Sequence, residues 1–228
     1  MMKNNWAVRT QRGYLADVRT LFNFAVKRGL ARHNPANACE LPSPDSALPP
    51  GIHTPAEVRA VMLAVQKIDL DVCRHLAVRY FAGVRTSEVH RLDESHLRHD
   101  AGLVEIPAAK SKTRRRRLIT IQPNLAAWLA IGGVLRPIGA MSVRAVIAQA
   151  LRATGVEWKD NVTRHSFVSY HLAQFKSAAA TALEAGHTEA MTFAHYREIV
   201  TPAEAKEFWE ITPCQDPGHS IKAAHIAS

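Results

Sequence analysis

Residues 102–121, GLVEIPAAKSKTRRRRLITI, contain two β-prone runs in a chain whose other patterns are helical. The runs 102–106 and 118–121 are rich in aliphatic and β-branched residues, which favour strands. Between them, Lys110–Arg117 carries six positive charges in eight residues. We therefore predict an antiparallel hairpin with a charged tip. Such a tip suits contact with a phosphate backbone, although a solvated charge run or a localisation-like patch is the ordinary explanation.

Helical patterns surround this hairpin. Apolar residues recur at three- and four-residue spacing over 10–29, and Gly29 is expected to end that helix. A proline-rich stretch follows, and Thr54, Pro55 and Glu57 then have the spacing of a capping box with proline at the first helical position. Periodicity and end signals predict further helices at about 55–66, 70–82, 87–92, 123–131, 142–153 (capped by Ser142 and stopped by Gly155), 163–174, 177–185 and 202–209.

The expected fold is mainly α with a small antiparallel β-sheet, an α+β arrangement. We expect a partial helical domain over 1–45, a linker over 46–53, a catalytic domain over 54–212 and a C-terminal tail over 213–228. The helical fragment before the linker is too short to hold a large core of its own.

Charge favours a nucleic-acid partner. The 228 residues include 29 Lys+Arg against 20 Asp+Glu, a net charge of +9, and the pI is about 9.8. Arginine outnumbers lysine 20 to 9, and guanidinium groups bind phosphate oxygens in pairs. A basic protein whose charge only keeps it soluble is the alternative.

Composition also excludes several classes of protein. With 47% hydrophobic residues the chain can bury a core, yet no apolar run reaches the roughly 20 residues needed to cross a bilayer. Cys39, Cys73 and Cys214 are odd in number and far apart, which argues against a disulfide scaffold or zinc ribbon and favours the cytoplasm. The histidines lack HxH or HExxH spacing, so a metal-dependent nuclease is disfavoured.

The segment Ala82–Glu88, AGVRTSE, reads as a turn between two helices. Gly83 permits a sharp turn, Thr86 can cap the next helix, and Arg85 is then placed to reach an anion. A surface ion pair of Arg85 with Glu88 is the commoner explanation of such a pattern.

Two further motifs lie near the C-terminus. Asn161–Tyr170, NVTRHSFVSY, opens a helix whose free N–H groups and Arg164 could bind an anion. His187 follows Glu184-Ala-Gly, and Tyr196 follows nine residues later. Taken singly, a histidine after a helix-ending glycine is more often a helix cap or a hydrogen-bonded histidine than a catalyst, and a lone tyrosine more often packs half-buried against its own domain.

In this order and spacing the motifs resemble those of the tyrosine recombinases, the phage-integrase family of site-specific DNA recombinases. Gly83–Glu88 is similar to the family's GxRxSE motif, and Asn161–His165 is similar to HxxRH with asparagine in the leading position. Ala185–His187 matches LGH, and Tyr196 matches the nucleophile. The hairpin lysine falls on Lys112, with Lys110 as its rival. The resemblance runs from about residue 10 to about 210, and the expected N-terminal core-binding domain is shortened.

The resemblance implies a site-specific recombinase or integrase that cuts and rejoins DNA through a covalent 3′-phosphotyrosine, for integration or excision of a mobile element. It implies double-stranded DNA as partner, a homo-tetramer on synapsed DNA, a monomer or weak oligomer when free, and a nucleoid-associated location without a membrane. No metal or other cofactor is implied. The catalytic residues carried over are Arg85, Lys112, Asn161, Arg164, His187 and Tyr196. The DNA-binding residues expected beside them are Lys110, Arg114, Arg115, Arg116, Arg117 and His165.

Within this resemblance, Arg85 and Arg164 would stabilise charge on the phosphate, Lys112 would protonate the leaving oxygen, and Tyr196 would attack. Asn161 can donate a hydrogen bond but cannot exchange protons. Two other readings stay open: a catalytically impaired DNA-binding remnant of an integrase, which the short N-terminus and Asn161 favour, and a type IB topoisomerase-like enzyme.

Overall fold

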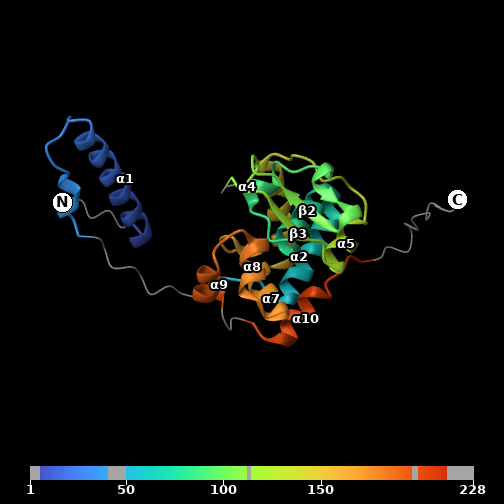
Figure 1. Cartoon of the computed structure of the whole chain (residues 1–228). Helices are drawn as coiled ribbons and strands as arrows, with labels where there is room; N and C mark the ends of the chain where they lie inside the picture. Colours follow the sequence, from blue (N-terminus) through green and yellow to red (C-terminus); the bar gives the residue numbers. More distant parts are fainter. Residues whose placement is uncertain (1–5, 41–49, 112–113, 197–199, 215–228) are drawn as a thin grey trace. The chain divides into compact units, whose positions relative to one another are not determined.

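The computed structural model describes residues 6–40, 50–111, 114–196 and 200–214 (Figure 1). The chain divides into two compact units, Met1–Leu48 and Pro49–Ser228. The elements are, in order, α1 (Val8–Lys27), η1 (Pro35–Ala38), α2 (Pro55–Ile68), α3 (Leu70–Phe81), α4 (Thr86–Val89), η2 (Glu94–His96), β1 (Leu97–Arg98), η3 (His99–Ala101), β2 (Leu103–Ile106), β3 (Arg117–Thr120), α5 (Pro123–Leu129), α6 (Ala140–Thr154), α7 (Val162–Phe175), α8 (Ala178–Ala185), α9 (Glu189–Tyr196) and α10 (Pro202–Trp209). The prediction of a mainly helical fold with a small antiparallel sheet is confirmed.

The first unit contains α1 and η1. Gly29 has a φ of +70° and follows the end of α1, as expected. Arg19 on α1 donates from Nε to the Ala36 carbonyl at 3.0 Å and from Nη2 to the Cys39 carbonyl at 2.7 Å. Asn34 Nδ2 donates to the Arg19 carbonyl at 3.0 Å. These bonds hold η1 against the helix.

The second unit is built around α2, α3 and α7. The predicted capping box is present at the start of α2, where the Thr54 hydroxyl accepts from the Glu57 N–H and Pro55 is the first helical residue. The buried face of α2 carries Val58, Val61, Met62 and Val65, which is the i, i+3, i+4, i+7 spacing of an amphipathic helix. Full burial of each such side chain contributes about 1.5–3 kcal/mol.

Helix α10 closes this core. The Phe208 ring stacks on Tyr170 of α7 with centroids 4.2 Å apart, and it also lies 5.2 Å from the Phe81 ring. The indole N–H of Trp128 donates to the Ile211 carbonyl at 2.9 Å. Aromatic pairs at such separations add about 0.5–1.5 kcal/mol beyond area burial, so α10 is tied to α3, α5 and α7.

The sheet has the order β1–β2–β3 with both pairs antiparallel. The predicted hairpin is therefore confirmed, and Glu105 lies opposite Leu118 in its register. Burial alternates along β3, where Arg117 and Ile119 face inward and Leu118 faces solvent. Arg117 thus belongs to the interior of the unit and not to the charged tip.

Two predicted helix starts are wrong. Helix α6 begins at Ala140 with Gly139 as its N-cap, so Ser142 lies inside the first turn. Helix α4 has Arg85 at the N-cap and Thr86 as its first residue, and it ends at Val89 instead of near residue 92. Helix α9 was not expected from the sequence, because its eight residues span barely two turns of periodicity. No helix in the described part of the chain is long and apolar enough to cross a membrane.

Gly83→Ala is expected to lower the free energy of unfolding by about 3 kcal/mol. Gly83 has a φ of +59°, and an added Cβ would lie 2.3 Å from the Phe167 ring, so left-handed strain and overpacking combine. Gly155→Ala is the matched control, because its φ is +70° but no atom lies within 4 Å of the added carbon. It should cost only about 1–2 kcal/mol. Equal losses in denaturant unfolding would contradict the close packing of Gly83 on Phe167.

Acidification from pH 7.5 to 5.5 is expected to lower the free energy of unfolding. Burial is the largest cause that lowers the pKa of His53, His75, His90 and His187. The unfolded chain takes up protons on these side chains near pH 6.5, before the folded chain does, so stability falls as pH drops through that value. Urea titrations at three pH values measure the slope. Constant or rising stability on acidification would contradict the buried, neutral state of these histidines.

Candidate active site

The turn between α3 and α4 positions the first site residue. The left-handed conformation of Gly83 reverses the chain, and Arg85 follows at the N-cap of α4. The Arg85 guanidinium donates from Nη1 to Glu88 Oε1 at 3.0 Å and from Nη2 to the Gly186 carbonyl at 2.6 Å. The ion pair of Arg85 with Glu88 that the sequence allowed is therefore present. The second hydrogen bond of the same guanidinium joins the start of α4 to the loop after α8.

Glu88 anchors two guanidinium groups. Its side chain is completely buried, and its second carboxylate oxygen accepts from Arg117 Nη2 at 2.8 Å. Removing one partner of a buried ion pair costs about 3–5 kcal/mol, because the other charge is left uncompensated. Glu88 therefore fixes Arg85 and Arg117 at defined positions.

Arg164 lies beside these groups on the first turn of α7. It donates from Nη1 to the Gly83 carbonyl at 2.7 Å and from Nη2 to the Ala185 carbonyl at 2.5 Å. Because Arg164 and Arg85 bind the adjacent carbonyls of Ala185 and Gly186, the two guanidinium groups lie side by side. Burial, followed by repulsion from Arg85 and Arg117, lowers the pKa of Arg164 to about 9. It remains a cation at neutral pH.

Gly186 allows this close approach. It ends α8 with a φ of +66°, and an added Cβ would lie 2.5 Å from Arg117 Nη1. A side chain at this position would displace the Arg117 guanidinium. The glycine of the Ala185–His187 motif thus has a direct role in building the site.

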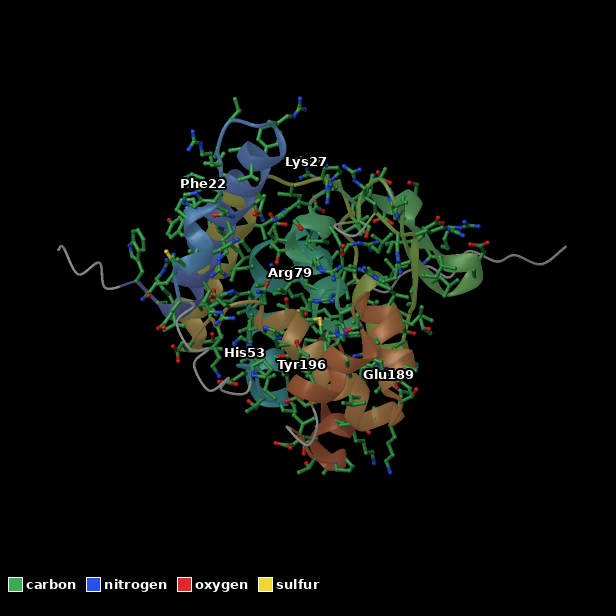
Figure 2. All side chains as sticks on the ribbon, turned by 60° about the vertical axis from the view of Figure 1, so that its left-hand side comes forward. Phe22, Lys27, His53, Arg79, Glu189 and Tyr196 are labelled. Carbon is green, nitrogen blue, oxygen red and sulfur yellow. The ribbon has the colours of Figure 1, made fainter. Side chains whose placement is uncertain are left out.

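Tyr196, which Figure 2 labels, ends α9 and lies between two histidines, His165 and His187. His165 Nδ1 is 2.5 Å from the Tyr196 hydroxyl oxygen. The His187 ring is parallel to the Tyr196 ring, with centroids 6.1 Å apart and an interplanar angle of 2°. Burial raises the pKa of Tyr196, and the charge of Arg164 opposes that rise. The phenol is neutral at physiological pH, and its oxygen is within hydrogen-bond distance of His165 Nδ1, which accepts from it when the His165 proton is on Nε2.

His187 keeps one ring nitrogen available. Its Nδ1 lies 3.2 Å from the Thr192 hydroxyl and 3.2 Å from the Thr188 carbonyl, while Nε2 is buried and has no hydrogen-bond partner among the described residues. Burial, with smaller contributions from Arg164 and Arg85, lowers the pKa of His187. In the tautomer in which Thr192 donates to Nδ1, the proton is on Nε2 and is available to an incoming acceptor.

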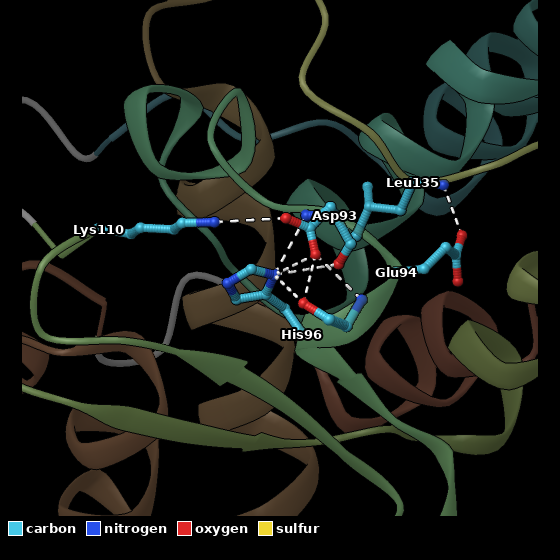
Figure 3. Close-up of polar contacts among 6 residues, drawn as sticks. Asp93, Glu94, His96, Lys110 and Leu135 are labelled. Carbon is cyan, nitrogen blue, oxygen red and sulfur yellow. Dashed lines mark hydrogen bonds and ion pairs between the residues drawn. The ribbon is translucent and has the colours of Figure 1, made fainter.

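The hairpin loop holds the remaining predicted lysines and arginines. Lys112 lies outside the described residues. Its rival Lys110 has Nζ 3.5 Å from Asp93 Oδ2, and the other Asp93 carboxylate oxygen lies 2.9 Å from His96 Nδ1 (Figure 3). Ion pairing therefore occupies the Lys110 ammonium group in this structure.

The loop arginines lie in two environments. Arg114 and Arg115 have exposed side chains, and Arg116 Nε donates to Glu105 at 2.7 Å. Arg117 differs, since it is buried against Glu88. From the sequence, Arg117 is expected to bind DNA with the other arginines of the hairpin, whereas the structure places its side chain in the interior of the unit, away from the exposed loop surface.

Asn161 precedes α7 in a left-handed conformation, with a φ of +52°. Its carbonyl accepts from the N–H groups of Arg164 and His165 at 3.0 Å each, and its side chain is exposed. Asparagine tolerates this backbone region better than most residues. The residue type at position 161 therefore suits the backbone that presents Arg164.

The structure thus brings together five residues that the sequence predicted separately: Arg85, Arg117, Arg164, His187 and Tyr196. Sequence reasoning missed the central position of Glu88 and the contact of His165 with Tyr196. The sequence RLIT over 117–120 does not alternate between polar and apolar residues, so it carried no signal for the inward direction of Arg117. Nor did any pattern point to His165, because its partner lies 31 residues away.

The cluster is suited to bind an anion. Arg85 and Arg117 both pair with one carboxylate, Glu88, and Arg164 lies beside them, so the site carries excess positive charge. A phosphate oxygen accepts from guanidinium groups in fixed geometry, and the Tyr196 hydroxyl is adjacent. The described residues contain no group of three or more His, Cys, Asp or Glu side chains arranged to hold a metal ion.

Sequence comparison relates the chain to known recombinases. No family model matches it. The tyrosine recombinase XerC of Pseudomonas putida is 28% identical over 208 residues, which cover 81% of this chain and 68% of the relative. XerC of Pseudomonas entomophila is 28% identical over 209 residues, and XerC of Stutzerimonas stutzeri is 27% identical over 205, with the same coverage.

Solved structures share the fold. An integrase of the transposon Tn1549, in complex with transposon right end DNA, has a TM-score of 0.67 at 16% identity and covers 90% of this chain and 80% of that chain. A lambda integrase dimer bound to a COC′ core site has a TM-score of 0.65 at 14% identity, covering 85% and 75%. The XerA recombinase has a TM-score of 0.56 at 16% identity, covering 86% and 82%.

Proposed function

Because this chain belongs to the tyrosine recombinase and integrase family, we propose that it cuts and rejoins DNA strands through a covalent 3′-phosphotyrosine. The observation that carries the proposal is the Tyr196 hydroxyl, 2.5 Å from His165 Nδ1, beside a cluster of three guanidinium groups. This arrangement supplies a nucleophile, a proton acceptor and an anion site together.

In the first step the Tyr196 oxygen attacks phosphorus and its proton passes to His165 Nδ1. The O–P bond to tyrosine forms as the bond from phosphorus to the 5′-oxygen breaks. One phosphodiester replaces another, so the step needs no external energy source. The phenol would be a weak nucleophile without this acceptor, because burial raises the pKa of Tyr196.

Arg85 and Arg164 stabilise the charge that develops on the non-bridging oxygens. Their positions are preset by the carbonyls of Ala185 and Gly186, so little reorganisation accompanies the reaction. Arg117, held by Glu88, adds positive charge near Arg164. His187 Nε2 donates a further hydrogen bond to the phosphate.

The leaving 5′-oxygen requires a proton. We assign this role to Lys112 and not to Lys110, whose ammonium group lies 3.5 Å from Asp93. Asn161 can supply an amide hydrogen bond to the phosphate but no proton transfer. A nucleophilic 5′-hydroxyl in the second step reverses the same transfers and rejoins the strand.

The wider assignment follows from the same proposal. Double-stranded DNA is the substrate, with Lys110 and Arg114–Arg116 along its backbone, and integration or excision of a mobile element is the outcome. The first 45 residues form part of a DNA clamp, residues 54–212 form the catalytic domain, and four copies act on synapsed DNA in the nucleoid.

A nicked duplex that loses a short fragment after cleavage tests this function, since the second step is then blocked. The purified chain, in chelator, should form an adduct that survives denaturant. Duplex binding without any adduct would instead support a catalytically impaired DNA-binding remnant. Relaxation of supercoiled plasmid without exchange of strands between two duplexes would support a type IB topoisomerase-like enzyme.

A further inference from the structure

A second arginine in this unit is buried without a counter-charge. Arg79, on α3, is 5% exposed and is labelled in Figure 2. Its Nε is completely buried with no hydrogen-bond partner, and no described carboxylate forms an ion pair with its guanidinium. Burial lowers the pKa of Arg79 to about 10, so it is still a cation at neutral pH.

The surroundings of Arg79 are cationic and aromatic. Its guanidinium carbon lies 5.5 Å from the centre of the Trp158 ring, which supports a planar cation on one face. His90 lies close by, and its Nδ1 is 2.9 Å from the Ile138 carbonyl. The charges of Arg79 and of the exposed Arg144 add to the effect of burial in lowering the pKa of His90.

Such a cluster is unfavourable in the free protein. Buried polar groups in proteins are almost always hydrogen-bonded, and an uncompensated buried charge costs several kcal/mol. The ion pairs of Arg74 with Glu94 and Arg117 with Glu88 show that this fold otherwise provides a carboxylate for its buried arginines. If the anionic partner of Arg79 is a ligand, the protein without that ligand leaves the guanidinium unpaired over the Trp158 ring.

We propose that Arg79, with His90 and Arg144, is a second phosphate-binding site, which takes a backbone phosphate of the duplex near the one that is cut. This inference rests on the proposed function. The same segments carry both sites, because Arg79 precedes Arg85 by six residues and Trp158 precedes Asn161 by three. The second phosphate fixes the register of the strand, while the Arg85 and Arg164 cluster holds the reacting one.

Duplex binding of Arg79→Met and the original chain, measured between 50 and 200 mM salt, tests the site. The substitution keeps a long apolar side chain over Trp158 but removes the charge. Affinity at the lowest salt should fall roughly 10-fold, as expected for charge-assisted hydrogen bonds. The slope of log affinity against log salt should become shallower by about 0.9, the value for one phosphate contact.

Two further variants separate phosphate binding from other causes. Arg144→Met, an exposed change on α6, should also reduce the slope. It tests the same site even if the buried Arg79→Met variant does not fold. Arg152→Met is the matched control, since it removes an exposed charge from the last turn of the same helix, and it should leave the slope unchanged. Equal effects of Arg144→Met and Arg152→Met would overturn the site in favour of a diffuse charge effect.

Thermal unfolding completes the test. Arg79→Met should be at least as stable as the original chain, because an unpaired buried cation is removed. Lower stability with an unchanged salt slope would overturn the proposal and give Arg79 a structural role. An unfolding temperature raised by inorganic phosphate only when Arg79 is present, with unchanged duplex affinity, would assign the site to free phosphate and overturn the DNA contact. If the original chain bound no duplex, the proposed function itself would fail.

Discussion

Tyr196→Phe is expected to abolish the covalent protein–DNA adduct while leaving duplex affinity within roughly twofold. The substitution removes the hydroxyl oxygen that the proposed step joins to phosphorus, and the remaining ring still packs between His165 and His187. A nucleophile is not replaced by the other site residues, so the loss should exceed about 10⁴-fold. Denaturing gel electrophoresis of a labelled nicked duplex measures the adduct, and filter binding measures the affinity.

The other tyrosines of the second unit provide the control. The Tyr80 hydroxyl lies 2.6 Å from His53 Nδ1, and the Tyr170 hydroxyl donates to the His53 carbonyl at 2.9 Å. Both rings are buried, and burial raises the pKa of each phenol. Tyr170→Phe should therefore keep the adduct at a modest cost in stability. Adduct formation that survives Tyr196→Phe would exclude Tyr196 as the nucleophile.

Arg164→Ala is expected to slow cleavage by about 10²–10³-fold, the usual cost of removing one preorganised donor. Duplex affinity should fall only a few-fold, because the exposed arginines of the hairpin loop and the Arg85 and Arg117 cations remain. The rate comes from single-turnover trapping with enzyme in excess, and the affinity comes from titration of an uncut duplex. The two numbers separate transition-state stabilisation from simple binding.

Two comparisons make the Arg164 result specific. Arg91→Ala removes an exposed arginine that donates to the Ser87 carbonyl at 2.9 Å, and it should leave the cleavage rate nearly unchanged. Arg164→Lys keeps the charge but cannot bridge the carbonyls of Gly83 and Ala185 as a fork. Its cleavage rate should therefore lie between that of Arg164→Ala and that of the original chain. Equal losses of rate and affinity in Arg164→Ala would reduce Arg164 to a phosphate anchor.

The local features of this fold were predictable from the sequence. The capping box at Thr54, the left-handed stops at Gly29 and Gly155, and the β2–β3 hairpin all follow from short-range rules. Each depends on residues a few positions apart. The order of the motifs likewise indicated which arginines and which tyrosine would meet.

Long-range packing set the features that the sequence did not indicate. Arg117 ended a run of like charges, yet its place on the inner side of β3 makes it a partner of buried Glu88. His165 was grouped with the DNA contacts, but the last turn of α9 brings the Tyr196 hydroxyl onto its Nδ1. Burial and pairing across 29 and 31 residues decide these roles, and periodicity carries no information about them.

Mass spectrometry of the trapped adduct tests the central claim most directly. After nuclease and protease digestion, the account predicts one modified peptide, with a nucleotide joined through its 3′-phosphate to Tyr196. The cut strand should carry a free 5′-hydroxyl. A nucleotide on Tyr14, Tyr80, Tyr170 or any residue other than a tyrosine, or a link through a 5′-phosphate, would contradict the assignment of this site.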